Sequence, residues 1–468
     1  MHDNIAANDL GPWYAGVTRY QWLVLVIASL GWIFDVFEAQ IFVASMREAL
    51  PSLVPPGTPK GTIEFYEKIT LGMFLLGGAV GGVFFGMLSD RIGRTRTMIY
   101  TILMYSAFTC VSAFAMTWWH LAILRFFVAL GTGGEWAVAA SMVSEVFPKR
   151  ARAWSSAIFH GSSTFGTLLA VAAGTFIVGN PVLQSDTFPS LPWRIGFLMG
   201  VLPALLIVWI RVSLREPEKA ATAIDPAMAP ARGKIGELFS SQLLRNTLVG
   251  LGLASAGLAT YWGVHIYGKD LLLAAAERER LVELGALPRG ETSPPLTVEE
   301  RFELLQPYRT SLKRWEMLGM LLATLGGGVG LVAFGPLSER FGRRGTFLFF
   351  FLGGAGIALL LFRGLPDAGI SLLTLLLPVF GFLTIGMHAG YAVYFPELFP
   401  TRLRGTGSGF CFNVGRVVAA PILFISGWMQ KDWGYTLSDS VSILSLLYLV
   451  GAALLIFAPE TKGRELPE

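Results

Sequence analysis

The chain has 468 residues, of which 53% are hydrophobic and only 15% charged, and its formal net charge is +4. Soluble domains carry about 25% charged residues, so this composition excludes an ordinary soluble domain and predicts a protein embedded in membrane lipid. The small positive charge does not indicate a nucleic-acid partner, because the basic residues lie at the ends of apolar runs. The two cysteines, Cys110 and Cys411, lie inside such runs, which favours packing over a disulfide or metal site.

Twelve apolar runs approach the roughly 20 residues that a helix needs to cross about 30 Å of hydrocarbon. The predicted spans of the first half are 20–45, 67–88, 97–117, 120–143, 153–178 and 194–214. Those of the second half are 244–268, 313–335, 346–363, 370–394, 405–429 and 438–458. The N-terminal stretch lacks a basic region and an obvious cleavage site, so the first span is expected to remain as an anchor. The sequence thus predicts an all-α membrane protein with twelve transmembrane helices.

Two loop motifs occur twice in this order of spans. GMLSDRIGRTR at 86–96 and GPLSERFGRR at 335–344 begin at glycines that stand 249 positions apart. SEVFPKRAR at 144–152 and PELFPTRLR at 396–404 are offset by 252 positions. Two motif pairs at nearly one offset indicate a duplicated chain, and parallel repeats of this kind are typical of two-bundle transporters.

The duplication divides the chain into an N-terminal six-helix bundle at 1–214, a linker at 215–243 and a C-terminal six-helix bundle at 244–468. Lys and Arg gather in the short loops of one side, with the linker and the tail, so the positive-inside rule places both termini in the cytoplasm. The long charged loop 269–312 lies on the other side, where long loops are largely exempt from the rule. Helical spacing at 271–287 predicts a small helical cap there.

Two carboxylates stand in the first predicted span. Asp35 and Glu38 are three residues apart, so they share one helix face. A carboxylate at membrane depth is expensive and must face a cavity, pair with a cation or stay protonated. Two close carboxylates disfavour joint ionisation, which is the property that a proton-coupling group needs. The alternative is that one of them simply pairs with an arginine on a neighbouring span.

Two further charges, Arg125 and Glu135, lie in the fourth span. Ten positions separate them by about 15 Å along a helix, so they cannot pair with each other. Glu135 follows Gly133 and Gly134, which let another helix come close, and it is a candidate partner for the Asp35 face or for a cation elsewhere. From the sequence alone, Arg125 is interpreted as a pairing residue near the inner or outer mouth.

Arg416 is the most suggestive cation for an anionic substrate. It lies in the eleventh span with Asn413 about one turn before it, and an Arg fork suits a carboxylate bidentately. At the repeat offset of 252 its counterpart is Thr164, so the repeat does not require the arginine. The alternative is a buried salt bridge with one of the carboxylates.

Other polar residues within the spans are further candidates for substrate contact, with lining or packing as the alternative. They are Gln40, His160, Ser163, Thr164, His388 and Tyr391. No GxxxxGK[ST] string, His/Cys cluster or nucleophile–base pair is found, so we expect no ATP, metal, cofactor or enzymatic activity.

The loop GMLSDRIGRTR resembles the GxLxDRxGRR signature of the major facilitator superfamily, and GPLSERFGRR is similar to it with Glu339 in place of Asp90. PETKGR at 459–464 resembles the sugar-porter branch. LGWIFDVFEAQIF at 30–42 and RFFVALGTGGEW at 125–136 resemble the metabolite:proton symporters, which include carriers of sialate, lactate, nicotinate and aromatic acids. The second string departs from that pattern at Ala129, where the family often has Gly. In the resembling families, the arginine at the position of Arg125 is linked to proton movement, so Arg125 and Glu135 join Asp35 and Glu38 as the predicted proton-coupling residues.

The resemblance implies that the loop motifs form a cytoplasmic gate that holds the two halves together while the outer side is open. The alternative is that their arginines only set topology. The implied gate residues are Gly86, Asp90, Arg91, Gly93, Arg94, Glu145, Arg150 and Arg152, with Gly335, Glu339, Arg340, Gly342, Arg343, Glu397, Arg402 and Arg404.

These observations predict a secondary active transporter that works by alternating access, as a monomer, in the bacterial inner membrane. The expected reaction is proton-coupled symport of a small organic anion, either a monocarboxylate or an aromatic acid. A sugar or polyol proton symporter is the alternative, and a non-transporting membrane sensor with a carrier fold is an alternative of another class.

Overall fold

The computed structural model describes residues 11–173, 176–177, 190–214, 233–287 and 298–468. The helices of the first half are α1 (Arg19–Ser52), α2 (Lys60–Ile92), α3 (Arg94–Ser112), α4 (Trp118–Val146), α5 (Lys149–Gly161), α6 (Ser163–Ala173), α7 (Leu191–Leu198) and α8 (Ala204–Ser213). Those of the second half are α10 (Leu244–Gly263), α11 (Gly268–Glu283), α12 (Val298–Leu305), α13 (Arg309–Leu359), α14 (Ile370–Ile385), α15 (Ala389–Leu398), α16 (Arg404–Ala419), α17 (Pro421–Lys431), α18 (Leu437–Leu444) and α19 (Leu447–Leu454).

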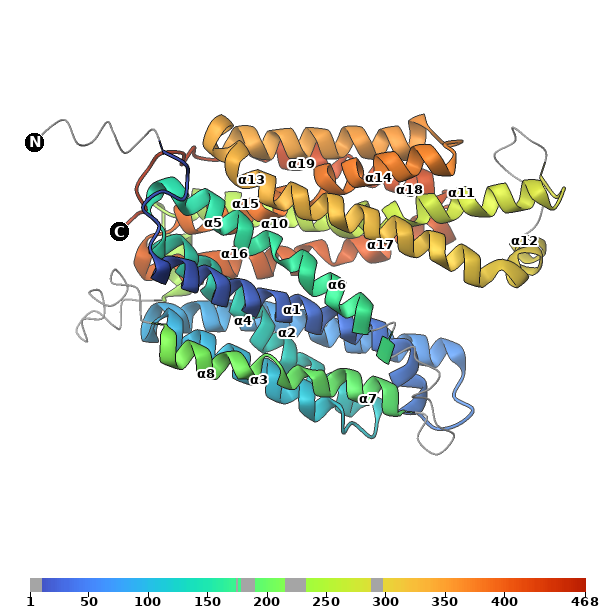
Figure 1. The fold of residues 1–468 in the computed structure, drawn as a ribbon, viewed down its shortest axis with the longest axis horizontal. Helices are drawn as coiled ribbons and strands as arrows, with labels where there is room; N and C mark the ends of the chain where they lie inside the picture. Colours follow the sequence, from blue (N-terminus) through green and yellow to red (C-terminus); the bar gives the residue numbers. More distant parts are fainter. Residues whose placement is uncertain (1–10, 174–175, 178–189, 215–232, 288–297) are drawn as a thin grey trace, which may run out of the picture.

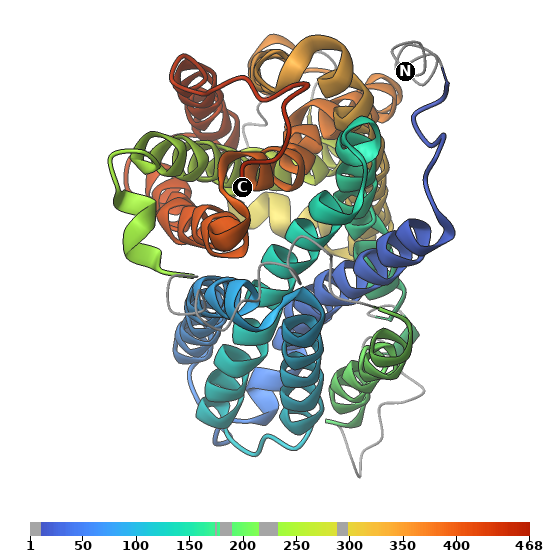
Figure 2. The same ribbon diagram turned by 90° about the vertical axis from the view of Figure 1, so that its left-hand side faces the viewer.

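The two halves form two groups of roughly parallel helices that lie against each other along their length (Figure 1). The end view in Figure 2 shows the first half below and the second half above, with α1 and α5 running along the boundary. The C-terminus lies at one end of the molecule, and α12 lies at the opposite end (Figure 1). Trp13 stacks on Trp154 of α5 at 5.1 Å, so the described N-terminal segment reaches the same end as the C-terminus.

Eight helices in the described part of the chain are long and apolar enough to cross a membrane. They differ from the twelve predicted spans for identifiable reasons. Ser311–Gly364, with 54 residues, covers two predicted spans, and Gly342 at φ 80° breaks it between them. The predicted spans 97–117, 153–178 and 194–214 correspond to shorter or more polar helices, and part of 153–178 lies outside the described residues. The twelve-span topology remains a prediction.

Helix α2 contacts both halves through glycines on two of its faces. A Cβ atom at Gly81 would lie 1.9 Å from the carbonyl oxygen of Leu130 in α4, so the two backbones touch there. A Cβ atom at Gly86 would lie 2.6 Å from the carbonyl oxygen of Gly405 in α16, across the boundary between the halves. Small residues allow this close approach where helices pack in lipid. The glycine that begins the loop motif therefore lets α2 and α16 come together at the end where the gate is predicted.

The predicted helix at 271–287 is present as α11, Gly268–Glu283. With α12 it packs around a small apolar cluster of its own, made of Ala276, Leu281, Leu287, Leu305 and Leu312. This cluster lies at the end of the molecule opposite the C-terminus (Figure 1).

Candidate functional site

A buried polar network joins three helices of the first half. Glu38 of α1 forms an ion pair with Arg125 of α4, through Oε1 and Nη1. Hydroxyl groups of α3 complete this pair: Thr109 donates to Glu38 at 3.0 Å, and Ser112 accepts from Arg125 at 2.7 Å. The Arg125 guanidinium also faces two aromatic rings, at 5.1 Å and 4.7 Å from their centroids. Glu38 is therefore the carboxylate that meets an arginine of the neighbouring span.

Glu135 occupies a separate position in the same interior. The Thr101 hydroxyl of α3 donates to Glu135 Oε2 at 2.5 Å. The second oxygen, Oε1, lies against α1, because a Cβ atom at Gly31 would be 2.7 Å away. As the ten-residue separation predicts, Glu135 and Arg125 do not pair with each other.

Asp35 is the least satisfied charge of this interior. Only 2% of its surface is exposed, and neither carboxylate oxygen has a hydrogen-bond partner among the residues that the structure describes. The charges that act on it are Glu135, Glu38 and, from the second half, Arg416. An ionised carboxylate in such a place needs a counter-charge or a proton.

Arg416 faces this interior from α16. Its guanidinium lies 5.0 Å from the centroid of Phe412, and that ring stacks on Trp136 of α4 at 4.0 Å. Nη1 of Arg416 would be 3.3 Å from a Cβ atom at Gly78 of α2, so the cation lies at the boundary between the halves. Within the described ranges Arg416 is half-buried and makes no ion pair.

Asn413, predicted beside Arg416, is fully buried and already engaged. Its side-chain amide donates to the carbonyl oxygens of Gly133 at 3.2 Å and Gly409 at 3.1 Å. The first of these bonds crosses from α16 to α4. In this conformation Asn413 therefore connects the two halves, and a role in substrate contact stays a prediction.

The predicted histidines and hydroxyls lie around the boundary in different surroundings. His160 Nδ1 accepts from the Trp136 indole at 3.1 Å. His388 donates to the Gly257 carbonyl at 3.1 Å, and Tyr391 to that of Leu253 at 3.1 Å, so both contact α10. Three further predicted residues are half-buried: Gln40, Ser163 and Thr164.

The residues of this interior that the sequence analysis missed lie on α3. Thr101, Thr109 and Ser112 each bond a buried charge of another helix, and Tyr105 stands between them. Their spacing of four, four and three residues places them on one helix face. This spacing was visible in the sequence, but hydroxyl residues are common in membrane helices and do not single out a site.

The first-half gate cluster consists of Asp90, Arg94, Glu145 and Arg404. Arg94 pairs with Asp90 at 2.5 Å and with Glu145 at 2.9 Å. Arg404, which begins α16 in the second half, pairs with the same Glu145 at 2.7 Å. All four side chains are almost fully buried, so three predicted gate residues of the first half and one of the second meet in one network.

Asp90 also accepts hydrogen bonds from the first turn of α16. The backbone N–H groups of Gly405 and Thr406 donate to it at 3.0 Å and 2.8 Å, and the Thr406 hydroxyl donates at 2.5 Å. The N-terminus of a helix favours a negative charge, because its free N–H groups and its dipole point toward it. The contact therefore holds α2 of the first half against α16 of the second.

The second-half gate cluster consists of Glu339, Arg343, Glu397 and the tail residues Glu460 and Thr461. Arg343 pairs with Glu339 at 2.8 Å and Glu397 at 2.7 Å, and the Thr461 hydroxyl donates to Glu397 at 2.6 Å. Glu460 accepts from the backbone N–H groups of Arg343 and Arg344 at 3.0 Å and 3.1 Å. Burial opposes the ionisation of Glu460, but these and two further N–H groups in the tail lower its pKa below the ordinary value.

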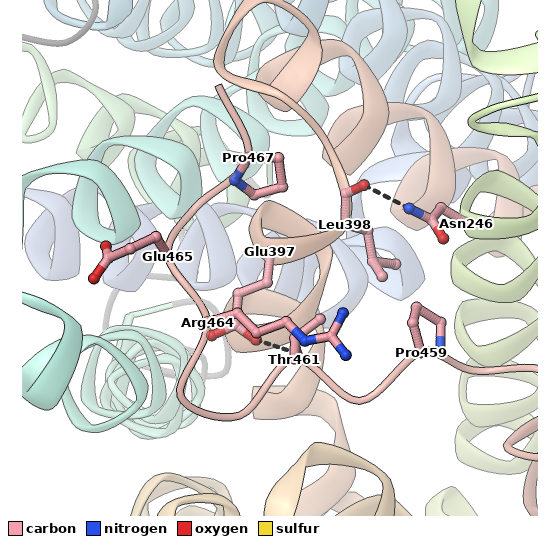
Figure 3. Close-up of a pocket in the computed structure, with 8 residues that line it drawn as sticks. All are labelled: Asn246, Glu397, Leu398, Pro459, Thr461, Arg464, Glu465 and Pro467. Atoms are coloured by element: carbon pink, nitrogen blue, oxygen red, sulfur yellow. Dashed lines mark hydrogen bonds between the residues drawn. The ribbon is translucent and has the colours of Figure 1, made fainter.

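The tail also closes a pocket of about 270 Å³ beside this cluster. Figure 3 shows Thr461 bonded to Glu397 on one side of the pocket, and Asn246 bonded to the Leu398 carbonyl on the other. Pro467 at the far end of the tail accepts from Arg404 at 2.9 Å. The tail thus connects the second-half gate cluster to Arg404, which belongs to the first-half gate cluster.

The remaining predicted gate residues shape or surround these clusters. Gly93 and Gly342 adopt φ values of 101° and 80°, which turn the chain sharply between consecutive helices. Arg152 donates to the Ser144 carbonyl at 3.0 Å, and Arg402 pairs with Glu237. Others lie at the same end of the molecule: Arg91 and Arg340, which are exposed, Arg150, and Gly335, which packs against α5.

The profile of the Major Facilitator Superfamily matches residues 16–277, which is more than half of the chain, so the chain belongs to this superfamily. A second profile, Sugar (and other) transporter, matches residues 319–468. The chain is therefore an integral membrane transporter of this superfamily and not an enzyme.

Relatives and structures agree with this assignment. The chain is 28% identical to a putative metabolite transport protein of Haemophilus influenzae, over 96% of this chain and 99% of the relative. It is 27% identical to the niacin transporter NiaP of Acinetobacter baylyi, over 96% of each chain. Its fold is similar to that of the proton:xylose symporter XylE bound to 6-bromo-6-deoxy-D-glucose, with a TM-score of 0.71 and 16% identity over 96% of this chain and 98% of that one.

Proposed function

We propose that this chain carries a small organic anion, a monocarboxylate or an aromatic acid, together with protons by alternating access. One observation carries the proposal: the charges of Asp35 and Arg416 act on each other across the two halves, and neither has an ion-pair partner in the described residues. Two opposite charges without ion-pair partners at membrane depth cost free energy unless a ligand binds each of them. A proton and a carboxylate substrate are the ligands that fit.

The coupling follows from competition for one cation. While Asp35 is ionised, its negative charge acts on Arg416 and weakens the binding of an incoming anion there. When Asp35 takes a proton, the arginine is free to hold the substrate carboxylate bidentately. Glu38 and Arg125, already paired with each other, would respond to the same proton through the shared α1 face.

The gate clusters supply the alternating step of this proposal. The first-half gate cluster keeps the cytoplasmic side closed, and a carrier must break it to release substrate inward. The full proposal includes twelve transmembrane spans, both termini in the cytoplasm, bundles at 1–214 and 244–468 with the linker 215–243 between them, and the long loop 269–312 outside. It also includes a monomeric protein in the bacterial inner membrane.

The name of the niacin transporter supports an aromatic acid as the substrate. The alternative, a sugar or polyol, is supported by the Sugar (and other) transporter match in the second half. A sensor with a carrier fold would bind solute without accumulating it, so flux into sealed vesicles separates that possibility from both.

The test compares an acid with its neutral analogue, nicotinate with nicotinamide, in binding and counterflow. Arg416→Ala should lose the preference for the acid and weaken its binding by roughly 30-fold or more, since truncating one partner of a buried charge pair costs about 2–5 kcal/mol. Arg416→Lys should lose only part, because it keeps the charge but not the fork. If a wider panel shows that wild type prefers sugars or neutral analogues, the organic-anion proposal fails.

Proton coupling is tested separately on the carboxylates. Asp35→Asn should abolish accumulation driven by a pH gradient while exchange of substrate across the membrane continues. Normal accumulation in both Asp35→Asn and Glu38→Gln would remove these two residues from the mechanism.

A further inference from the structure

We infer that the Tyr105 hydroxyl relays protons between Asp35 and Glu135. The inference deepens the proposed function and rests on it, because it assigns the proton path of the same carboxylates. Tyr105 has no exposed surface, and its hydroxyl is buried without a hydrogen-bond partner in this part of the chain. A buried hydroxyl left unsatisfied costs free energy, so its retention needs an explanation.

The position of Tyr105 on α3 supplies that explanation. Thr101, one turn before it, donates to Glu135, and Thr109, one turn after it, donates to Glu38. Ser112 continues the same face and accepts from Arg125. The hydroxyl residues before and after Tyr105 on this helix face each bond a buried charge. Among the described residues, the Tyr105 hydroxyl has no such partner.

Helix α1 shows the matching order on the opposite side. Gly31 lies against Oε1 of Glu135, Asp35 follows one turn later, and Glu38 comes next and pairs with Arg125. Four helical residues rise about 6 Å, so both helices repeat at the same interval. Tyr105 on α3 therefore lies at the level of Asp35 on α1, whose two oxygens likewise have no hydrogen-bond partner among the described residues.

The approach of α3 to α4 fixes the backbone of Tyr105 in place. A Cβ atom at Gly131 of α4 would lie 2.8 Å from the backbone nitrogen of Tyr105, so the two helices are in direct contact at this level. The charged groups that act on Tyr105 are Asp35 and Glu38 from α1 and Glu135 from α4. Arg125 of α4 and Arg416 of α16 complete the set, each next to one of these acids.

A phenol suits a relay because it donates one hydrogen bond and accepts another. Protonated Asp35 gives its proton to the Tyr105 oxygen while the Tyr105 O–H proton passes to the free Oε1 of Glu135. One O–H bond forms and one breaks at Tyr105, which stays neutral throughout. Glu135 lies nearer the gate clusters than Asp35 does, because α3 begins at Arg94, so the step moves the proton toward the gate end.

The test uses the full chain in sealed liposomes, as wild type, Tyr105→Phe, Asp35→Asn and Tyr100→Phe. Phe keeps the ring, and removal of a hydroxyl without a partner is not expected to destabilise the fold. Tyr100 lies on the same helix with 50% of its surface exposed, so Tyr100→Phe is the matched control.

The first measurement is the infrared spectrum of the protein as the pH is changed, which needs no substrate. The carboxyl band that Asp35→Asn lacks should move in frequency in Tyr105→Phe and stay in place in Tyr100→Phe. A band that stays in place in Tyr105→Phe overturns the relay. If wild type has no Asp35 band at all, Asp35 does not titrate and the proposed coupling fails together with the relay.

The second measurement is transport of the acid that counterflow selects from labelled nicotinate, benzoate and lactate. Tyr105→Phe should slow gradient-driven accumulation by about tenfold or more, as expected for loss of a proton-transfer group, and leave counterflow intact. An equal loss of both would show a packing role, and normal accumulation would show no role; either result overturns the relay. Normal accumulation in Asp35→Asn would instead refute the proposed function.

Discussion

The two gate clusters are built from copies of one motif, yet they close in different ways. In the first, Glu145 receives Arg94 from its own half and Arg404 from the other half. In the second, Glu397 receives Arg343 from its own half and the hydroxyl of Thr461 from the tail. The first-half gate cluster therefore has an ion pair across the boundary between the halves, whereas the ion pairs described for the second-half cluster lie within its own half and Arg152 of the first half acts on Glu397 only through its charge.

The difference has its cause in a few residues. Asp90 is short and buried and reaches the N–H groups at the start of α16. Its counterpart Glu339 is longer, its side chain is 32% exposed, and in the described part of the chain its ion pair is with Arg343, four residues on. The repeat counterparts of Gly405 and Thr406 at the offset of 252 are Ala153 and Trp154, which offer a carboxylate less room. One copy of the motif thus controls contact between the halves, and the other stabilises a half.

The largest effect is expected for Glu145→Gln. The change leaves Arg94 and Arg404 buried without their shared carboxylate, and breaking a buried pair costs about 3–5 kcal/mol. The cytoplasmic side should open. Thiol labelling measures this in a variant that lacks Cys110 and Cys411 and carries Ser89→Cys, because Ser89 is buried beneath the contact with α16. Labelling should rise by about 100-fold, and unchanged labelling would contradict a gate at Glu145.

The matched change in the second half is Glu397→Gln, which should act on stability and not on opening. Arg343 loses its buried charged partner, and one amide oxygen is left as the acceptor for both Arg343 and Thr461, so the free energy of unfolding should fall by roughly 2–3 kcal/mol. Labelling of Ser89→Cys should stay at the wild-type rate. A rise as large as that in Glu145→Gln would show that both clusters control the same gate.

The sequence analysis named the loop residues of both clusters, because the loop motif is specific and its glycines and charges stand at fixed spacing, but it did not name Glu460 and Thr461 of the tail. The interior site was found in part: Asp35, Glu38, Arg125, Glu135 and Arg416 are charges in apolar runs, and few such charges occur. Their pairing could not be predicted, because it depends on how three helices cross. The row of hydroxyl residues on α3 was missed for the same reason, since the role of Thr101 or Tyr105 depends on which side chain of a neighbouring helix lies beside it.

The resemblance to the superfamily gave the fold, which the profile match and the structure of XylE bear out. The helix count was harder to predict. Gly342 and Ser162 interrupt helices at points that hydropathy does not mark. Helix α3 is less apolar because it carries the hydroxyl residues that bond the buried charges.

A smaller effect is expected for Asp90→Asn. Asn keeps one acceptor oxygen but loses the charge that the N-terminus of α16 favours, an interaction worth up to about 2 kcal/mol. Transport should slow by about tenfold with little change in substrate binding, since Asp90 lies at the gate end and away from Arg416. Glu339→Gln is the control and should change neither. A large loss of affinity with unchanged turnover would place Asp90 in the substrate site instead.

The smallest effect is expected for Glu460→Gln, and it should depend on pH. The N–H groups around Glu460 lower its pKa in the folded protein, so its ionised form stabilises the fold above the unfolded pKa of about 4.3. That contribution is lost as the pH falls through the lower folded value. Glu460 is half-exposed, so the contribution is under about 1 kcal/mol after solvent screening. Wild type should therefore unfold at a slightly higher temperature than Glu460→Gln at pH 7, and the two should converge below about pH 4. A difference that persists in acid would mean that the tail is held by packing of the chain around Pro459 and Pro467 and not by the charge of Glu460.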